Sequence, residues 1–232
     1  MKQVTESVAS FDLLSYVLEN SQSRWAQFVA ASSLKNLAAD HWSHFPQQGC
    51  IQLKESLCNF LVNKGTQCDQ QVLKMVIMLQ VKILKFAWFD IPAMQNVISD
   101  VIQLGTISER HRLISLTFIE ELIVEMGYVT RGKHLHLHRR ISVNFRDIYL
   151  MQIFSNSIDT LRRYTETVMA NQAFQKIRLD GTTGPLQHDN ASNGVHPAPS
   201  DLLVETLLQA LNVLEKCLNY DWTAVLCNET LD

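Results

Sequence analysis

Cysteine is scarce in this sequence and is not arranged in pairs. The five cysteines are Cys50, Cys58, Cys68, Cys217 and Cys227, an odd number without a Cys-x-x-Cys motif. A secreted disulfide framework needs an even, closely spaced set, so this distribution is typical of reduced thiols in a cytosolic or nuclear protein. The first residues also lack the basic flank and apolar run of a secretory signal.

Catalytic motifs and long uncharged apolar runs are missing as well. The chain contains no Gly-x-Ser-x-Gly, phosphate-loop or His-Glu-x-x-His sequence, so no enzyme class is indicated. The most apolar run, residues 72–89, contains Lys74, Lys82 and Lys85, whose charges would be costly in hydrocarbon. These lysines fall within about 80° of one another on a helical wheel. The run therefore predicts a helix packed between other helices rather than a membrane span.

Charge of one sign does not dominate the chain. The formal net charge is -3 over 232 residues, so there is no global basicity of the kind that nucleic-acid binding needs. Hydrophobic residues make up 47% of the chain and charged residues 19%, which is enough apolar side chain to form a core. The length fits one domain or part of a repeat array.

Helical periodicity is present along nearly the whole chain, and helix pairs recur about every 35–45 residues. Helices are expected at about residues 11–19, 25–42, 51–63, 72–89 with Asp69 as its N-cap, 92–104, 108–126, 137–148 and 201–222. The pattern predicts an all-α fold, a right-handed α-solenoid of about four to five HEAT-like helix pairs. A solenoid has polar caps at its ends. Because Phe11–Glu19 resembles half of a pair and no capping unit follows residue 222, we expect an N-terminal fragment of a longer array.

Residues 178–200 interrupt this pattern. They hold three of the eight glycines and three of the five prolines, which predicts a flexible loop. We expect this loop to join the two helices of one repeat, with residues 201–222 forming the helix that completes it. The chain is thus predicted to be a single solenoid over residues 1–232, with the preceding repeats at about 11–177.

Several segments resemble one family of proteins. Gln27, Ala30, Ala31 and Leu34 match a small-residue helix of the importin-β type N-terminal region. The segments ILKFAWFD, NVISDV, HRRISVNFRD and CLNYDW resemble, in order, segments of the exportin-7 branch, also called Ran-binding protein 16/17. The exportin-4 branch fits HRRISVNFRD less well. The resemblance covers about residues 11–222.

The resemblance implies a nuclear transport receptor without enzymatic activity or a cofactor. Such receptors bind Ran in its GTP form, carry folded protein cargo and contact Phe-Gly nucleoporins while they shuttle between nucleus and cytoplasm. We therefore expect a fragment of an exportin-like receptor. The alternative is a general α-solenoid interaction scaffold without a transport role.

Partner contact in a solenoid uses its inner helices, usually the second of each pair. We expect the second helices to be Ile51–Asn63, Ala93–Leu104 and about Leu137–Ile148. The candidate Ran-contact residues on them are Gln52, Glu55, Asn59, Asn96, Asp100, Arg139 and Arg140. The alternative interpretation is that these polar side chains are merely solvated.

Three histidines, His134, His136 and His138, alternate with leucines. On a strand they would share one side and could supply three zinc ligands, whereas on a helix only His134 and His138 share a face. A second such set is His41, His44 and Cys50. The apolar spacing after His138 is helical, so we expect a loop entering a helix and no metal at either cluster.

Charged side chains form two further groups. The basic group consists of Arg131, Lys133, Arg139, Arg140 and Arg146, with Arg110 and Arg112 nearby in sequence. Few aromatic residues accompany it, which favours a solvated surface first, an acidic protein partner second and RNA last. Glu121 and Glu125 share a helix face, and we interpret them as part of a solvated surface rather than as a catalytic pair.

Overall fold

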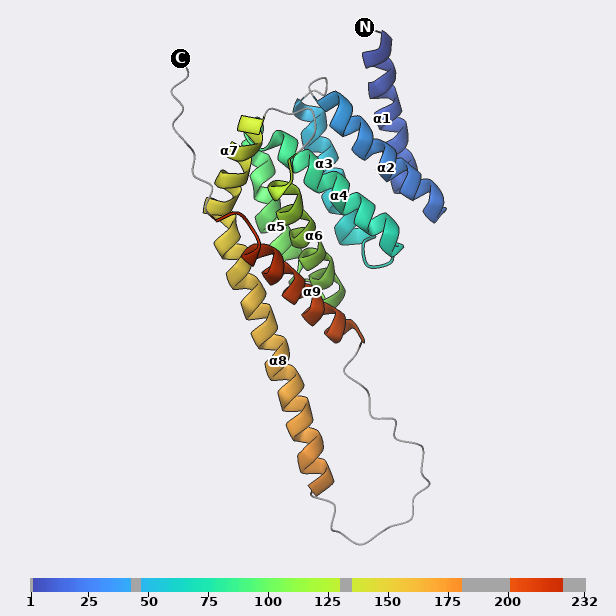
Figure 1. Cartoon of the computed structure of the whole chain (residues 1–232). Helices are drawn as coiled ribbons and strands as arrows, with labels where there is room; N and C mark the ends of the chain where they lie inside the picture. The colour runs from blue at the N-terminus through green and yellow to red at the C-terminus, as the bar shows by residue number, and fades with distance from the viewer. Residues whose placement is uncertain (1, 43–46, 130–134, 181–200, 223–232) are drawn as a thin grey trace.

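The chain folds into an array of helices without a strand in the residues that the structure describes (Figure 1). This computed structural model describes residues 2–42, 47–129, 135–180 and 201–222. The elements are α1 (Lys2–Asn20), α2 (Arg24–His41), α3 (Gln47–Asn63), α4 (Gln70–Ala87), the 3-10 helix η2 (Pro92–Asn96), α5 (Val97–Leu104), α6 (Glu109–Gly127), α7 (Leu135–Phe145), the π turn η3 (Arg146–Leu150), α8 (Met151–Asp180) and α9 (Asp201–Leu218). The predicted all-α class is confirmed.

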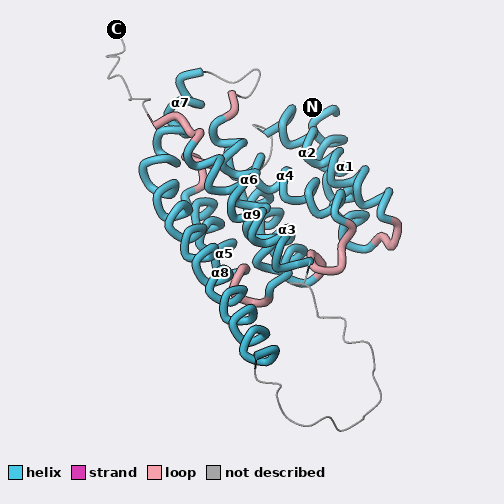
Figure 2. Tube along the Cα trace, turned by 60° about the horizontal axis from the view of Figure 1, so that its bottom comes forward, coloured by secondary structure: helices cyan, strands magenta, loops and turns pink. Residues whose placement is uncertain are grey.

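The helices pack as pairs that are consecutive in the chain. α1 packs against α2, α3 against α4, α5 against α6, and α8 against α9. Successive pairs are joined through their second helices, since α2 contacts α4, α4 contacts α6, and α6 contacts α9 (Figures 1 and 2). We call α2, α4, α6 and α9 the second-helix layer, and α1, α3, α5 and α7–α8 the first-helix layer. The arrangement confirms a HEAT-like solenoid of helix pairs.

The pairing predicted from the sequence is shifted by one helix. The sequence predicts α3, α5 and α7 to be second helices, but α3 and α5 are the first helices of their pairs, and α7 continues into α8, which packs against α9. The reason is α1, which begins at Lys2 rather than near Phe11 and packs along α2 as a full partner. The predicted half pair is therefore wrong. The predicted contact residues on α3, η2 and α5 consequently lie in the first-helix layer.

Side-chain caps explain where three of the second helices begin. The Ser23 hydroxyl accepts a hydrogen bond from the Ala26 N–H at the start of α2, 3.4 Å away. The Asp69 carboxylate accepts one from the Gln71 N–H at the start of α4, at 2.9 Å. Ser108 caps α6 in the same way. Each cap satisfies a backbone donor that a helix leaves unpaired in its first turn.

Trp88 is the centre of an aromatic cluster that joins α4 to the following pairs. Its side chain is fully buried, and its Nε1 donates to Oδ1 of Asn144 at 2.8 Å. The rings of Phe145 and Tyr149 lie edge-on to it, with centroids 6.0 and 5.7 Å away. This geometry is favourable for aromatic pairs and fixes the position of α7 against the end of α4.

α7, the π turn and α8 form one continuous helix in which the core face changes register. Ile141 and Phe145 are buried before the turn, and Leu150 and Ile153 are buried after it. The step from Phe145 to Leu150 is five residues, the spacing of a π-helix. Ile148, which continued α-helical spacing would place on the apolar face, is therefore 51% exposed.

The pair that follows α7 and the π turn consists of α8 and α9. α8 extends to Asp180, so the helix continues past Arg178, where the sequence predicts the loop to begin. α9 begins at Asp201 and packs against α8, so these two helices lie together as a pair. The rest of the predicted loop lies outside the described residues. No described helix is long and apolar enough to cross a membrane.

Candidate partner-binding surface

Charged side chains connect α4 to α6 across the second-helix layer. Nζ of Lys74 lies 3.0 Å from Oε1 of Glu121, and Nζ of Lys82 lies 2.7 Å from Oε1 of Glu125. Lys85 joins the second of these pairs, with its Nζ 3.4 Å from the same Glu125 oxygen. We call these five residues the charge ladder. Its members sit on two neighbouring helices, so it links two successive repeats.

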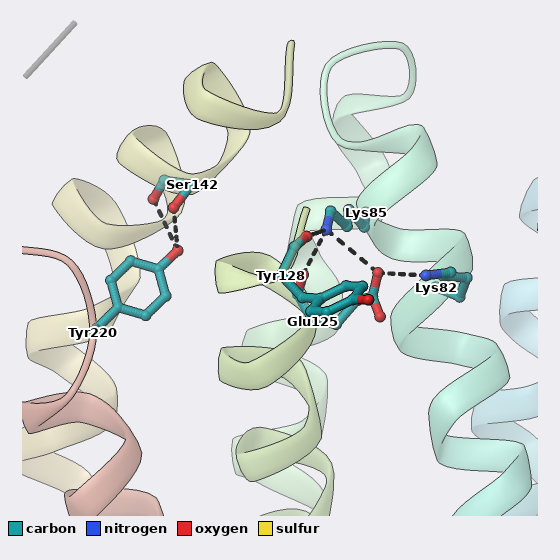
Figure 3. Close-up of polar contacts among 6 residues, drawn as sticks. All are labelled: Lys82, Lys85, Glu125, Tyr128, Ser142 and Tyr220. Atoms are coloured by element: carbon teal, nitrogen blue, oxygen red, sulfur yellow. Dashed lines mark hydrogen bonds and ion pairs between the residues drawn. The ribbon is translucent and has the colours of Figure 1, made fainter. Parts of the chain in front are cut away.

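Lys85 is the buried end of the charge ladder, with its side chain only 3% exposed. Its ammonium group donates to the backbone carbonyl of Glu125 at 2.6 Å and to that of Tyr128 (Figure 3). Burial lowers the pKa of Lys85, while the Glu125 carboxylate opposes that shift. The lysine therefore adds a donor to the Glu125 carbonyl, which also accepts from the Tyr128 N–H, and supplies a donor to the Tyr128 carbonyl just after α6.

The interpretation of Glu121 and Glu125 as a solvated surface is wrong. Their side chains are 18% and 19% exposed, and both are paired with lysines of α4. The signal for this arrangement is present in the sequence as a narrow lysine stripe on one helix and a glutamate pair at i, i+4 on another. Only the packing of α4 against α6 shows that the two stripes match.

A hydrogen bond from an uncharged amide extends the ladder to α9. Nε2 of Gln209 on α9 donates to Oε2 of Glu120 on α6 at 2.6 Å. The second-helix layer thus has polar links from α4 through α6 to α9. A partner that binds across these helices would meet groups whose positions are already fixed by one another.

Three of the predicted contact residues lie together in the first-helix layer. Gln52, Glu55 and Asn59 are exposed on α3 and line a groove of about 510 Å³ beside the end of α1. Asp100 of α5 is connected to α3 by an ion pair with Lys54 at 3.3 Å. Asn96 is exposed at the end of η2. The structure therefore brings these residues to neighbouring helices, but not to the second-helix layer.

The basic group predicted from the sequence does not form one patch. Arg139 lines a separate cavity near the start of α7, and the guanidinium of Arg140 lies 5.0 Å from the ring centroid of Phe89. Arg146 pairs with Asp147 at 2.8 Å, its side chain being 12% exposed. Arg110 donates to the Thr66 carbonyl and Arg112 is partly buried, whereas Arg131 and Lys133 lie outside the described residues.

The histidine cluster does not adopt the strand that would align it. His136 and His138 belong to α7, where residues two apart point to different sides. His134 and His44 lie outside the described residues, as does the side chain of His41. Within the described part of the chain, no three His, Cys, Asp or Glu side chains form a group that could hold a metal ion. The absence of a metal in the protein stays a prediction.

Acidification is expected to destabilise the fold through His138. Burial lowers the pKa of His138 below its ordinary 6.5, and the charge of Lys85 adds to this shift. The unfolded chain then binds the proton more readily, so stability is present above about pH 6.5 and is lost as the pH falls through the folded pKa. Urea unfolding at several pH values should show this loss. His138→Gln should reduce it, and His136→Gln, on the exposed side, should not. Equal pH dependence in all three proteins would contradict this assignment.

Comparisons with known proteins agree with the repeat architecture. Residues 1–63 match the family described as Importin-beta N-terminal domain. The chain is 25% identical to Exportin-7-B of Xenopus laevis over 99% of its length, and 24% identical to Ran-binding protein 17 of Homo sapiens over 100% of its length. Both alignments cover 19% of the relative, so the chain spans about a fifth of the length of these curated relatives. No solved structure gives a significant match.

These matches say what the chain is similar to. Residues 1–63 resemble the importin-β N-terminal domain, and the whole chain is similar to part of exportin-7 and of Ran-binding protein 17.

Proposed function

We propose that this chain is part of an exportin-like nuclear transport receptor that binds the small GTPase Ran in its GTP form. The observation that carries the proposal is the similarity to Exportin-7-B and Ran-binding protein 17 along essentially the whole chain, not only in residues 1–63. The names of these relatives describe export and Ran binding. Folded protein cargo, contact with Phe-Gly nucleoporins and shuttling between nucleus and cytoplasm belong to the same proposal, and no catalytic role is included.

The second-helix layer is the surface on which we place the Ran contact. Repeat solenoids bind partners along the surface formed by successive repeats. In this chain the closest packing between repeats runs through α2, α4, α6 and α9. Lys74 is the exposed member of the charge ladder, with 60% of its side chain accessible to solvent. It can therefore contact a partner without a change in the core.

Ran binding would be coupled to cargo binding through the curvature of the solenoid. The charge ladder and the contact between Gln209 and Glu120 fix neighbouring second helices relative to one another. A partner that spans these helices binds most tightly when the solenoid has one particular curvature. Cargo also binds most tightly at one curvature, so each changes the affinity for the other. Such coupling is reciprocal, because Ran strengthens cargo binding by the same factor as cargo strengthens Ran binding.

The test is capture of Ran by the purified 232-residue chain, with Ran loaded with GTP or with GDP. We expect the GTP form to be retained at least about fivefold better, the lower end of ordinary allosteric discrimination. The control is immobilised chain that has been heat-unfolded, which should retain neither form. Equal capture of the two forms would leave the scaffold function, without nucleotide-dependent transport, as the conclusion.

Two charge-reversed variants distinguish the two candidate contact surfaces. Lys74→Glu changes the second-helix layer, and Glu55→Lys changes the groove of the first-helix layer. We expect Lys74→Glu to weaken capture and Glu55→Lys to leave it unchanged. The opposite result would favour the contact set predicted from the sequence, which is Gln52, Glu55, Asn59, Asn96, Asp100, Arg139 and Arg140.

A further inference from the structure

A cavity of about 480 Å³ lies where the end of α6, the start of α7 and the end of α9 meet. One part of its lining is apolar and includes Ile123, Val124, Val129 and Leu135. Val124 is 45% exposed and Leu135 is 59% exposed, so this apolar wall is open to solvent. The volume is in the range of ordinary ligand sites and accommodates a large side chain together with adjoining backbone.

The rim of the same cavity is predominantly basic. Its cationic residues are Arg139 and Lys216, and Asp221 is the acidic residue of the lining; His138 also lines it but is neutral at pH 7, because burial lowers its pKa below 6.5. Arg139 is exposed and forms no ion pair with any residue that the structure describes. Lys216 lies 3.7 Å from the exposed carboxylate of Glu215, a surface pair that contributes little. The rim can therefore pair with an added negative charge.

The helix ends around the cavity favour an anion as well. The first turn of α7 contributes Leu135 and His138, which brings the positive end of its dipole to the cavity. α6 and α9 present their C-terminal ends there, but carbonyls at both ends are already bonded. Lys85 donates to the Glu125 carbonyl of α6 and to the carbonyl of Tyr128, just after α6, and Nε1 of Trp222 donates to the Cys217 carbonyl of α9 at 3.0 Å.

The floor of the cavity is fixed by a pair of hydroxyl groups. The hydroxyls of Ser142 and Tyr220 lie 2.8 Å apart, and Tyr220 also donates to the Ser142 carbonyl at 3.1 Å (Figure 3). These bonds connect α7 to the residues that follow α9. The cavity is therefore held open by contacts within the chain, and a ligand does not have to assemble it.

We propose that this cavity binds a short acidic peptide segment of a protein partner. A carboxylate of the segment pairs with Arg139, and a neighbouring bulky apolar side chain packs against Val124 and Leu135. A free phosphate would satisfy the rim but leave the apolar wall uncovered, and a neutral apolar peptide would leave Arg139 without a partner. The site is separate from the charge ladder, and it goes beyond the proposed Ran contact without depending on it.

Binding is measured with a fluorescein-labelled synthetic peptide of alternating glutamate and leucine, titrated with the 232-residue chain and followed by fluorescence anisotropy. Two control peptides have the same length, one alternating lysine and leucine and one alternating glutamate and serine. We expect saturable binding of the glutamate–leucine peptide alone. Absence of saturable binding, or equal binding of either control peptide, would overturn the proposal.

Neighbouring arginines provide matched variants for the same titration. Arg139→Glu should weaken binding about tenfold or more, because it places like charge against the carboxylate. Arg140→Glu makes the same change in net charge at the next residue, whose side chain packs on the Phe89 ring and does not line the cavity. We expect it to change affinity less than about twofold. Equal weakening by both variants would show non-specific electrostatic attraction and overturn the site. Arg139→Gln repeats the test without charge reversal, and thermal unfolding checks that each variant is folded.

Discussion

Replacing Trp88 with alanine is expected to lower the free energy of unfolding by about 3–5 kcal/mol. The side chain is fully buried between the end of α4 and the helix formed by α7 and the π turn. Its removal leaves a cavity between two repeats and leaves Oδ1 of Asn144 without the donor that it now has. Loss of packing and an unpaired polar group act in the same direction.

The measurement is urea unfolding followed by far-ultraviolet circular dichroism, because tryptophan fluorescence itself changes in the variant. Trp25→Ala is the matched control, since Trp25 is 71% exposed and stacks on Phe28 with a centroid distance of 6.0 Å. We expect this control to cost less than about 1 kcal/mol. Similar losses for the two variants would mean that Trp88 does not join the repeats as described.

Lys85→Met is expected to destabilise the fold by about 3–5 kcal/mol, although methionine fills a similar volume. The ammonium group of Lys85 satisfies the backbone carbonyls of Glu125 and Tyr128 and faces the Glu125 carboxylate. Methionine offers no donor, so the Tyr128 carbonyl loses the Lys85 donor and the Glu125 carbonyl keeps only the Tyr128 N–H, in a site that is largely closed to water. Glu125 keeps Lys82, which limits the loss.

Lys74→Met is the control for this prediction. Lys74 belongs to the same charge ladder, but its side chain is 60% exposed. We expect a loss of no more than about 1 kcal/mol, as for other surface ion pairs. Denaturant unfolding of both variants at low and high salt compares them directly. If Lys85→Met were as mild as Lys74→Met, the capping role of Lys85 would be refuted.

The helices themselves are largely predictable, because their ends carry local chemistry. Asp69 and Ser108 stand where α4 and α6 begin and act as caps. Gly65 follows α3, where a Cβ atom would lie 2.4 Å from the Leu61 carbonyl oxygen, a distance that no other residue tolerates. Such signals depend on a few neighbouring residues and can be recognised without the fold.

Which helices pair is not a local property, and the prediction was wrong there. The polar residues before Phe11 carry little periodic signal, so the sequence predicts a helix there that is too short to be a full partner of α2. This error shifts every later predicted pair by one helix. The contact residues Gln52, Glu55 and Asn59 were correctly predicted to be exposed, but they belong to the other layer. The charge ladder could not be predicted from the sequence for the same reason. Its lysines on α4 and glutamates on α6 form ion pairs only because the two helices are adjacent in the fold.

The π turn between α7 and α8 also has an evolutionary consequence. Its five residues complete a turn that an α-helix would close with one residue fewer. Deleting a residue there would restore α-helical geometry and shorten the step from Phe145 to Leu150 to four residues, which an α-helix also places on one face. Leu150 and Ile153 would stay in the core, and α8 would keep the same face toward α9. The π turn therefore absorbs one extra residue where it stands, so a lineage can gain or lose that residue without repacking the pair formed by α8 and α9.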